Sequence, residues 1–442
     1  MTPQRKETDR APVETLDLLS GDFAAVAFEH YARLRERGPV VRIRPVDGPE
    51  IWLITRFEEA RAALTDRRLS KDLTASEVAL VRVGVIRPQA VERVRRRNLL
   101  SIEAPDHTRL RRIVSRAFSP RRIAGLQPRI EEITHELLDA VAAVGRAELI
   151  ADVADPLPRA VITELLGVPR ADSDRLHAWV STRSLPPTVD NVRIREDAAL
   201  EQRTYLQDLV LAIRERLDPD VAEDDQPDLV SALIVAADEH DRLSEDEVVD
   251  MLNLLLNAGQ ETVTNLIGNA VLALLRHPRE RERLTGHPEA VAGAVEEILR
   301  YDGADEQATG RVALEDVEVG GVTIPRHALV HIGLASANHD PDRFEDPERF
   351  DVGRPRTQHL AFGHGHHVCL GAPLARMEVR IAIGAILDRF PDLALEGPGG
   401  EVRWRSRSLA GVARGLEALP VRFSPAPVGP PVLPMSRSGQ II

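Results

Sequence analysis

Apolar residues return at intervals of three and four positions over most of this chain, a spacing that predicts a mainly helical protein. Besides one helix that begins at Pro105-Asp106, the predicted helices cover residues 24–37, 57–64, 121–144, 158–166, 171–184, 192–217, 244–276, 292–301 and 372–390. Shorter runs rich in β-branched residues predict strands within 40–44, 51–55, 316–324, 328–332 and 401–424. We therefore expect a mainly α fold with small β-sheets.

The longest predicted helix, 244–276, is so apolar that it has to be buried. Ser244 and Glu247 form a capping box at its start, and about 33 residues of helix would span roughly 50 Å. Polar residues inside a buried helix are costly unless they are used, yet its centre reads Ala258-Gly259-Gln260-Glu261-Thr262. The two small residues would leave a gap beside the helix, in which a flat cofactor and a diatomic ligand would fit.

The chain contains one cysteine, Cys369, in a glycine-rich turn directly before the predicted helix 372–390. A helix N-terminus stabilises negative charge and lowers the pKa of a thiol, so this residue is set up to be a thiolate. A single thiolate is a known protein ligand of haem iron. Two alternatives are a buried structural cysteine and a zinc site made by His364, His366, His367 and Cys369. Zinc ligands normally come as separated pairs, and no second pair lies nearby.

The stretch around this cysteine reads Phe-Gly-x-Gly-x-His-x-Cys-x-Gly and resembles the haem-binding signature of the cytochrome P450 family. Its positions are filled by Phe362, Gly363, Gly365, His367, Cys369 and Gly371. The resemblance implies the cytochrome P450 fold, with a long central helix over haem b (iron protoporphyrin IX). It implies that Cys369 is the iron ligand, and that the cofactor is also bound by Phe362, Gly363, His367 and Gly371.

The centre of the 244–276 helix resembles a second motif of the same family, Ala-Gly-x-Asp/Glu-Thr, which binds dioxygen. The resemblance implies that Ala258 and Gly259 lie against the cofactor. It also implies two catalytic residues: Thr262 would support the dioxygen, and Glu261 would help to pass protons. Taken alone, the same residues also fit a solvated kink or a hydrogen bond between helices.

A set of basic residues matches the positions at which the family holds the two haem propionates. His107 and Arg111 are four residues apart and share one helix face. Arg311 and His367 match two further propionate donors. The resemblance implies that the four side chains converge on two carboxylates through charge-assisted hydrogen bonds, which are the strong kind.

Glu297 and Arg300 are three residues apart on a predicted helix and resemble the family's Glu-x-x-Arg motif. The third member of that motif would be Arg349. The implied role is structural, with buried charges that fix the chain leading into the cysteine loop. An ion pair on a solvated helix face is the usual meaning of this spacing.

Composition and charge narrow the remaining choices. We find no repeat or linker, and expect one domain over 21–424, a flexible N-terminal arm over 1–20 and a flexible C-terminal tail over 425–442. The net charge of −13 argues against nucleic-acid binding. One cysteine fits a reducing compartment, and the polar first residues contain no signal peptide or membrane anchor. We expect a cytoplasmic monomer.

Arginine supplies nearly all the positive charge and gathers in two stretches. One is the run 93–97, which is either a solvated helix face or, in a region that the family uses as a substrate lid, a contact to an acidic substrate. The other is either a solvated surface or a docking patch for an acidic ferredoxin, and consists of Arg109, Arg112, Arg116, Arg121 and Arg122.

The resemblance implies a monooxygenase that inserts one oxygen atom from O2 into a C–H or C=C bond of a small hydrophobic substrate. Electrons would come from a ferredoxin and its reductase, and residues 304–309 would line the substrate pocket. The residues around Ala308-Thr309 and 415–421 resemble members that tailor polyketides, macrolides and other secondary metabolites. Two alternatives are a peroxide-dependent haem-thiolate enzyme and a non-catalytic haem carrier or sensor.

Overall fold

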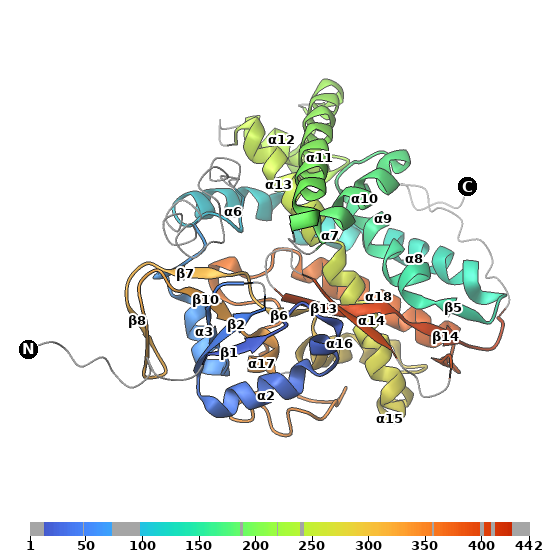
Figure 1. The fold of residues 1–442 in the computed structure, drawn as a ribbon. Coiled ribbons are helices and arrows are strands. Elements are labelled where there is room, and N and C mark those ends of the chain that lie inside the picture. Colours follow the sequence, from blue (N-terminus) through green and yellow to red (C-terminus); the bar gives the residue numbers. More distant parts are fainter. Residues whose placement is uncertain are drawn as a thin grey trace, which may run out of the picture.

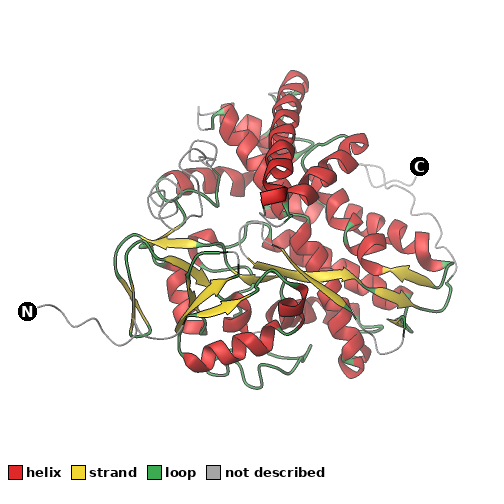
Figure 2. Cartoon of the chain, in the orientation of Figure 1, coloured by secondary structure: helices red, strands yellow, loops and turns green. Residues whose placement is uncertain are grey.

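The computed structural model describes residues 13–46, 48–72, 98–185, 189–218, 220–238, 243–355, 358–397, 402–407 and 412–426. Helices dominate this part of the chain, and the strands form a layer that runs through one half of the molecule (Figure 2). The predicted mainly α fold with small β-sheets is therefore confirmed. The basic run 93–97 lies outside the described residues.

The strands form one six-stranded sheet and three smaller ones. The large sheet has the order β1-β2-β3-β10-β7-β4, the three-stranded sheets are β11-β14-β5 and β12-β13-β6, and β8 pairs with β9. The bounds are β1 Glu14–Leu16, β2 Val40–Pro45, β3 Ile51–Ile54, β4 Leu69–Ser70, β5 Arg146–Glu148, β6 Asp305–Gln307, β7 Arg311–Ala313, β8 Val317–Val319, β9 Val322–Ile324, β10 Leu329–Ile332, β11 Ala394–Leu395, β12 Arg403–Arg407, β13 Val412–Ala418 and β14 Pro420–Arg422.

The helices fill the rest of the molecule (Figure 1). Their bounds are α1 Gly21–Ala25, α2 Ala27–Arg37, α3 Phe57–Thr65, α6 Asp106–Ala117, α7 Pro120–Gly125, α8 Gln127–Ala142, α9 Pro156–Leu165, α10 Ser173–Arg183, α11 Val189–Arg216, α12 Leu229–Asp238, α13 Glu245–Ala258, α14 Glu261–Arg276, α15 Pro278–Glu282, α16 Pro288–Asp302, α17 Leu334–Asn338 and α18 Ala372–Arg389. Within the described chain, no helix combines the length and apolarity that a bilayer crossing requires.

Regular structure begins before residue 20, the predicted end of the N-terminal arm. Glu14–Leu16 form β1, which pairs in parallel with β2, and the Ser20 side chain caps α1 by accepting from the Phe23 N–H at 3.0 Å. The prediction of a flexible arm over 1–20 is therefore wrong for this part, because a three-residue strand is too short to show alternation. Residues 1–12 and the tail from 427 lie outside the described chain.

The prediction of one continuous helix over 244–276 is wrong at its centre. The helix ends as α13 at Ala258, and α14 starts at Glu261 after Gly259 and Gln260, where Gln260 has φ −95° and ψ −73°. The Thr262 hydroxyl donates to the Ala258 carbonyl at 2.9 Å, in the place of a backbone N–H. A threonine hydroxyl that bonds back by four residues bends a helix.

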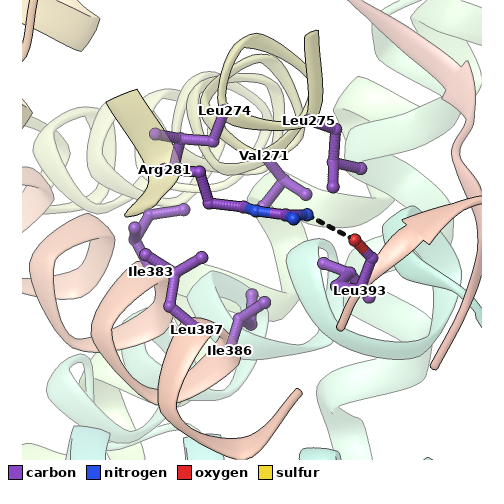
Figure 3. A pocket seen from close by; sticks show the side chains of 8 residues that line it. All are labelled: Val271, Leu274, Leu275, Arg281, Ile383, Ile386, Leu387 and Leu393. Carbon is purple, nitrogen blue, oxygen red and sulfur yellow. Dashed lines mark hydrogen bonds between the residues drawn. The ribbon is translucent and has the colours of Figure 1, made fainter. Parts of the chain in front are cut away.

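The buried core surrounds α14, which packs against α16, α18 and β13. An apolar crevice between α14 and α18 is too narrow for a water molecule (Figure 3). Arg281 of α15 closes it by donating to the Leu393 carbonyl at 2.5 Å. The tight packing fixes the helix that follows the cysteine against the helix that carries the Glu261-Thr262 pair.

Candidate active site

The cysteine loop is a tight turn held by its own backbone. The Cys369 N–H donates to the Phe362 carbonyl at 2.9 Å, and the Gly363 N–H donates to the Leu360 carbonyl at 2.8 Å. Gly363 and Gly365 have φ of +71° and +77°, a region that favours glycine. A Cβ at Gly365 would also lie 2.6 Å from the Thr65 Cγ2 atom of α3. The glycine positions of the signature are therefore required by the shape of the turn.

The Cys369 thiol is accessible at the start of α18 although protein atoms surround it closely. Burial raises the pKa of this thiol, while the N–H groups of Gly371 and Ala372 and the Arg111 guanidinium act in the opposite direction. The predicted lowering of the thiol pKa is therefore wrong for the chain alone, because desolvation outweighs the helix N-terminus. A bound metal cation would reverse this balance, since a coordinating thiol is deprotonated outright.

Ala258 is exposed and Thr262 partly exposed, and these two residues form an accessible stripe in the middle of α13 and α14, where most neighbouring residues are buried. They lie four residues apart, and Glu261 beside them is 7 % exposed. Gly259 points elsewhere, because a Cβ there would lie 3.1 Å from the Ile162 Cδ1 atom of α9. The small size of Gly259 serves helix packing, so its predicted place against the cofactor is not supported by its direction.

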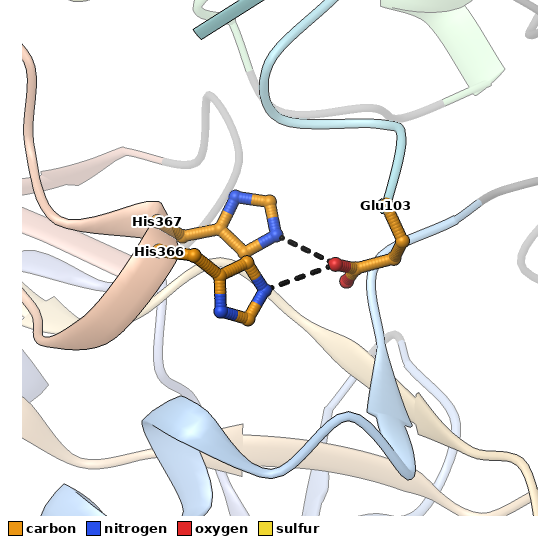
Figure 4. A group of neighbouring side chains, drawn as sticks. All are labelled: Glu103, His366 and His367. Atoms are coloured by element: carbon orange, nitrogen blue, oxygen red, sulfur yellow. Dashed lines mark hydrogen bonds and ion pairs between the residues drawn. The ribbon is translucent and has the colours of Figure 1, made fainter. Parts of the chain in front are cut away.

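A polar cluster joins the cysteine loop to the chain before α6 (Figure 4). The Glu103 Oε2 atom lies 3.0 Å from the His366 Nε2 atom and 3.2 Å from the His367 Nε2 atom. Burial alone would raise the pKa of Glu103, but hydrogen bonds from His367, the Lys71 N–H and His366 lower it to about 2. Sequence reasoning missed Glu103 and named His366 only as a member of the alternative zinc site, because the contact between the two residues spans 263 residues of chain.

The zinc alternative that includes Cys369 has no support in the geometry. Within the described residues, the grouping with metal-ligand spacing comprises Glu103, His366 and His367, whose ligand atoms lie within 4.8 Å of one another. His366 and His367 turn toward Glu103, and Cys369 is not a member.

The predicted propionate donors lie around this cluster. The His107 ring centroid lies 4.3 Å from that of His367, and its buried Nε2 atom has no hydrogen-bond partner in the described chain. Arg311 is 2 % exposed and donates to the Leu64 and Leu69 carbonyls, each at 3.1 Å. Its Nε atom lacks a partner among the residues described. Burial lowers the pKa of Arg111, and its charge acts on the Cys369 thiol.

Buried charges fix the segment that leads into the cysteine loop. Arg300 donates to both carboxylate oxygens of Glu297 at 2.8 and 2.9 Å, and both residues are almost fully buried. Arg354 adds a contact to Glu297 at 3.2 Å. The prediction that Arg349 is the third member is wrong for its side chain, which is exposed and lies 3.5 Å from Asp351. Only the Arg349 carbonyl takes part, as an acceptor from Arg300.

Comparison with known proteins decides the family. The chain is 42% identical over 423 residues to the cytochrome P450 monooxygenase PikC of Streptomyces venezuelae, covering 95% of this chain and 96% of PikC. The chain belongs to the cytochrome P450 family. The Cytochrome P450 family model itself matches residues 190–397.

Other relatives agree over nearly the whole chain. The 6-deoxyerythronolide B hydroxylase of Saccharopolyspora erythraea is 41% identical, over 92% of this chain and 98% of its own. The structure of the tirandamycin C-bound P450 monooxygenase TamI superposes with a TM-score of 0.81 at 38% identity, over 93% of this chain and all of that one. This chain is thus a cytochrome P450 monooxygenase similar to bacterial members of the family, and its cofactor is haem.

The residues of this P450 fit haem. The accessible Cys369 thiol would bind the iron. The buried nitrogen donors of His107 and Arg311 lack partners among the residues that the structure describes. Unpaired buried donors are costly, and carboxylates would satisfy them. In this structure Glu103 accepts a hydrogen bond from His367. His367 is one of the donors that the family motif assigns to a propionate.

Proposed function

We propose that this P450 hydroxylates or epoxidises a polyketide, a macrolide or a related hydrophobic secondary metabolite. The observation that carries the proposal is the accessible Ala258–Thr262 stripe among mostly buried residues, combined with the accessible Cys369 thiol. For hydroxylation the balance is substrate plus O2, two electrons and two protons, giving alcohol and water. Haem, when bound at Cys369, supplies the O2 activation and the oxygen transfer.

The protein contributes position and protons. His107, Arg111, Arg311 and His367 would hold the haem carboxylates and so fix the plane of the cofactor. The Thr262 hydroxyl lies at the helix break, where it donates a hydrogen bond to the Ala258 carbonyl at 2.9 Å. Glu261 lies one residue away and would resupply that hydroxyl with protons, because a buried carboxyl is a suitable proton donor and acceptor.

The substrate class rests on the relatives. Their names include a 6-deoxyerythronolide B hydroxylase and a mycinamicin IV hydroxylase/epoxidase, the latter from Micromonospora griseorubida and 42% identical. A vitamin D(3) 25-hydroxylase of Pseudonocardia autotrophica is 42% identical as well. The polyketide biosynthesis cytochrome P450 PksS of Bacillus subtilis is 38% identical, and together these names support a polyketide, a macrolide or a related metabolite as the substrate.

We propose a ferredoxin as the electron donor, docked at an open groove beside the cysteine helix. The groove encloses about 620 Å³ and is lined by Ala292, Val295, Glu296, Gln358, Pro373, Arg376, Met377 and Arg380. Arg376 joins it to the cysteine loop, because its guanidinium lies 4.6 Å from the Phe362 ring centroid. Arg380 shows no ion pair within the described chain. The monomeric, cytoplasmic state expected from the sequence is part of this proposal.

The arginine patch of the α6–α7 region serves a different purpose. Arg116 pairs with Glu223 at 2.7 Å, Arg121 pairs with Asp225 at 2.9 Å, and Arg122 donates to the carbonyls of the same loop. Arg109 pairs with Glu247 of α13. These side chains tie the helices together, so the geometry favours internal pairing over a docking patch.

The test is turnover of the purified protein with ferredoxin, ferredoxin reductase and NADPH on a panel of macrolide and polyketide substrates. We expect product one oxygen heavier than substrate, and the reduced carbon monoxide complex should show the thiolate-ligated Soret band, which Cys369→Ser should abolish. Equal product from hydrogen peroxide alone would instead indicate the peroxide-dependent enzyme. No substrate-dependent NADPH consumption would indicate a haem carrier or sensor.

A further inference from the structure

Asp305 is the first residue of β6 and pairs with Ala413 of β13. Successive side chains of a strand point to opposite faces, and its neighbour Glu306 points into the core. The Tyr31 hydroxyl donates to Glu306 at 2.9 Å, and Arg414 lies 3.9 Å from the Glu306 carboxylate. Asp305 therefore points to the other face of β6, away from this buried network.

The Asp305 carboxylate interacts electrostatically with both parts of the active site, the Cys369 thiol and Glu261. Burial and repulsion from Glu261 raise the pKa of Asp305 to about 7. Asp305 in turn is one of the charges that raise the pKa of the Cys369 thiol. Asp305 thus lies within electrostatic range both of the thiol and of the Glu261-Thr262 pair.

No positive charge of the described chain compensates this carboxylate. Asp305 has no hydrogen-bond or ion-pair partner there, and its ionisation responds to Glu261 but to no cation. The nearest arginine on the paired strand, Arg414, binds Asp302 and the Ala24 carbonyl. Asp305 is partly exposed, so a ligand can reach its carboxylate, and a cation on that ligand would supply the charge partner that the described chain lacks.

We propose that Asp305 is a substrate-recognition residue and that this P450 binds substrates carrying a basic aliphatic amine, with the cationic nitrogen paired to the Asp305 carboxylate. The inference rests on the proposed function, whose hydrophobic substrate class it narrows to amine-bearing members. The apolar body of such a ligand would lie against the accessible Ala258–Thr262 stripe, while Asp305 fixes the position of the nitrogen.

The test uses the haem-containing protein and two probes that differ only in charge. Decanoylcholine carries a permanent cation that can neither lose a proton nor bind iron, and dimethylbutyl decanoate has carbon in place of that nitrogen. Isothermal titration calorimetry and the shift of the Soret band give both dissociation constants. We expect the wild type to bind the cation roughly ten- to a hundredfold more tightly, as one charged contact would give.

Variants separate this residue from general charge effects. Asp305→Asn should abolish the preference and leave affinity for the neutral ester unchanged, and Asp305→Ser serves the same test should the amide fold poorly. Glu318→Gln removes the same charge from the exposed face of β8 and should keep the preference. Equal affinity for both probes in the wild type, or a preference that survives both Asp305 variants, would overturn the proposal. Both results are binding measurements that do not depend on turnover. A failure of the proposed oxidation would therefore be detected separately, in the turnover assay.

Discussion

Glu297 holds three groups at once, one from its own helix and two from the segment 351–354. Its oxygens accept from the Arg300 guanidinium, from the Arg354 Nε atom at 3.2 Å and from the Asp351 N–H at 3.0 Å. Because the carboxylate is 4 % exposed, every one of these donors replaces a water molecule that it lost on folding. Removal of one donor should therefore be felt in the stability of the whole segment.

A matched pair of arginine variants checks this assignment. Arg354→Gln should lower the free energy of unfolding by about 1–3 kcal/mol, since it removes charged hydrogen bonds to a buried carboxylate. Arg349→Gln should change it by less than about 0.5 kcal/mol, because that side chain is exposed. Urea titration of both variants measures the difference, and equal losses would contradict the role given to Arg354.

His331 on β10 provides a pH-dependent contribution. Its Nδ1 atom lies 2.8 Å from the Gln307 Oε1 atom, and burial lowers its pKa to about 4. The unfolded chain takes up the proton first, near pH 6.5, so stability falls as the pH drops from 6.5 to about 4 and then levels.

The prediction is that His331→Gln flattens this part of the stability curve. The variant should lose less stability than the wild type between pH 6.5 and 4, by on the order of 1–3 kcal/mol. Denaturant titrations at pH 7, 5.5 and 4 measure it. Parallel curves for the two proteins would show that His331 does not titrate in this way.

At the scale of elements, the break between α13 and α14 is the feature with most consequence for the chemistry. At the break, the Ala258 carbonyl accepts from the Thr262 hydroxyl instead of from a backbone N–H. A hydroxyl held in this way is oriented before any ligand arrives, which is the purpose of a preorganised site. The same two residues are the accessible ones, so the break and the accessible stripe coincide.

Thr262 should therefore matter for how electrons are used rather than for folding. Thr262→Ala should lower product formed per NADPH by about tenfold or more, with hydrogen peroxide released instead, because proton delivery loses its positioned group. Thr262→Ser keeps the hydroxyl and should stay close to wild type. Product and peroxide yields measured on the same samples give the result, and an alanine variant that remains fully coupled would contradict it.

At the scale of the whole molecule, the arginines of α6 and α7 hold the helices together, and the positive charge left for a partner lies elsewhere. The net charge is −13, and the arginines of α6 and α7 are largely paired internally. The groove beside α18 offers Arg380 against this acidic background, while Arg376 in the same groove pairs with Glu296 at 2.6 Å. An acidic redox protein would be guided there by charge, and such guidance weakens as salt rises.

Reversal of one charge in the groove tests this. Arg380→Glu should raise the KM for ferredoxin roughly tenfold and leave kcat at saturation nearly unchanged, because only encounter and docking are affected. Arg279→Glu makes the same change on the exposed face of α15 and serves as the control. The rate at which ferredoxin reduces the P450 is measured over a salt series. Equal rates for both variants would contradict docking at the groove.

The fold class and the cysteine turn were predictable because both depend on the spacing of residues close together in the sequence. Helical periodicity and the glycine positions around Cys369 need only local sterics. Glu103 and Arg354 were not predictable, since each depends on a partner far away in sequence: Glu103 and His367 are 264 residues apart, and Arg354 and Glu297 are 57 residues apart. The helix break at Gly259 was expected only as the alternative of a solvated kink, because apolar periodicity continues through it and hides the side-chain hydrogen bond that bends the backbone.

The buried Glu297–Arg300 pair also has a consequence for how fast the chain between α17 and the cysteine loop moves. This segment has no helix or strand over its described residues 339–355, yet the Asp351 N–H is donated to buried Glu297 and the Val352 N–H to Glu280, both at 3.0 Å. Amide protons held in this way exchange with solvent only when the segment opens. An irregular backbone can thus be as slow to open as the helices around it, and the chain that leads into the cysteine loop stays fixed.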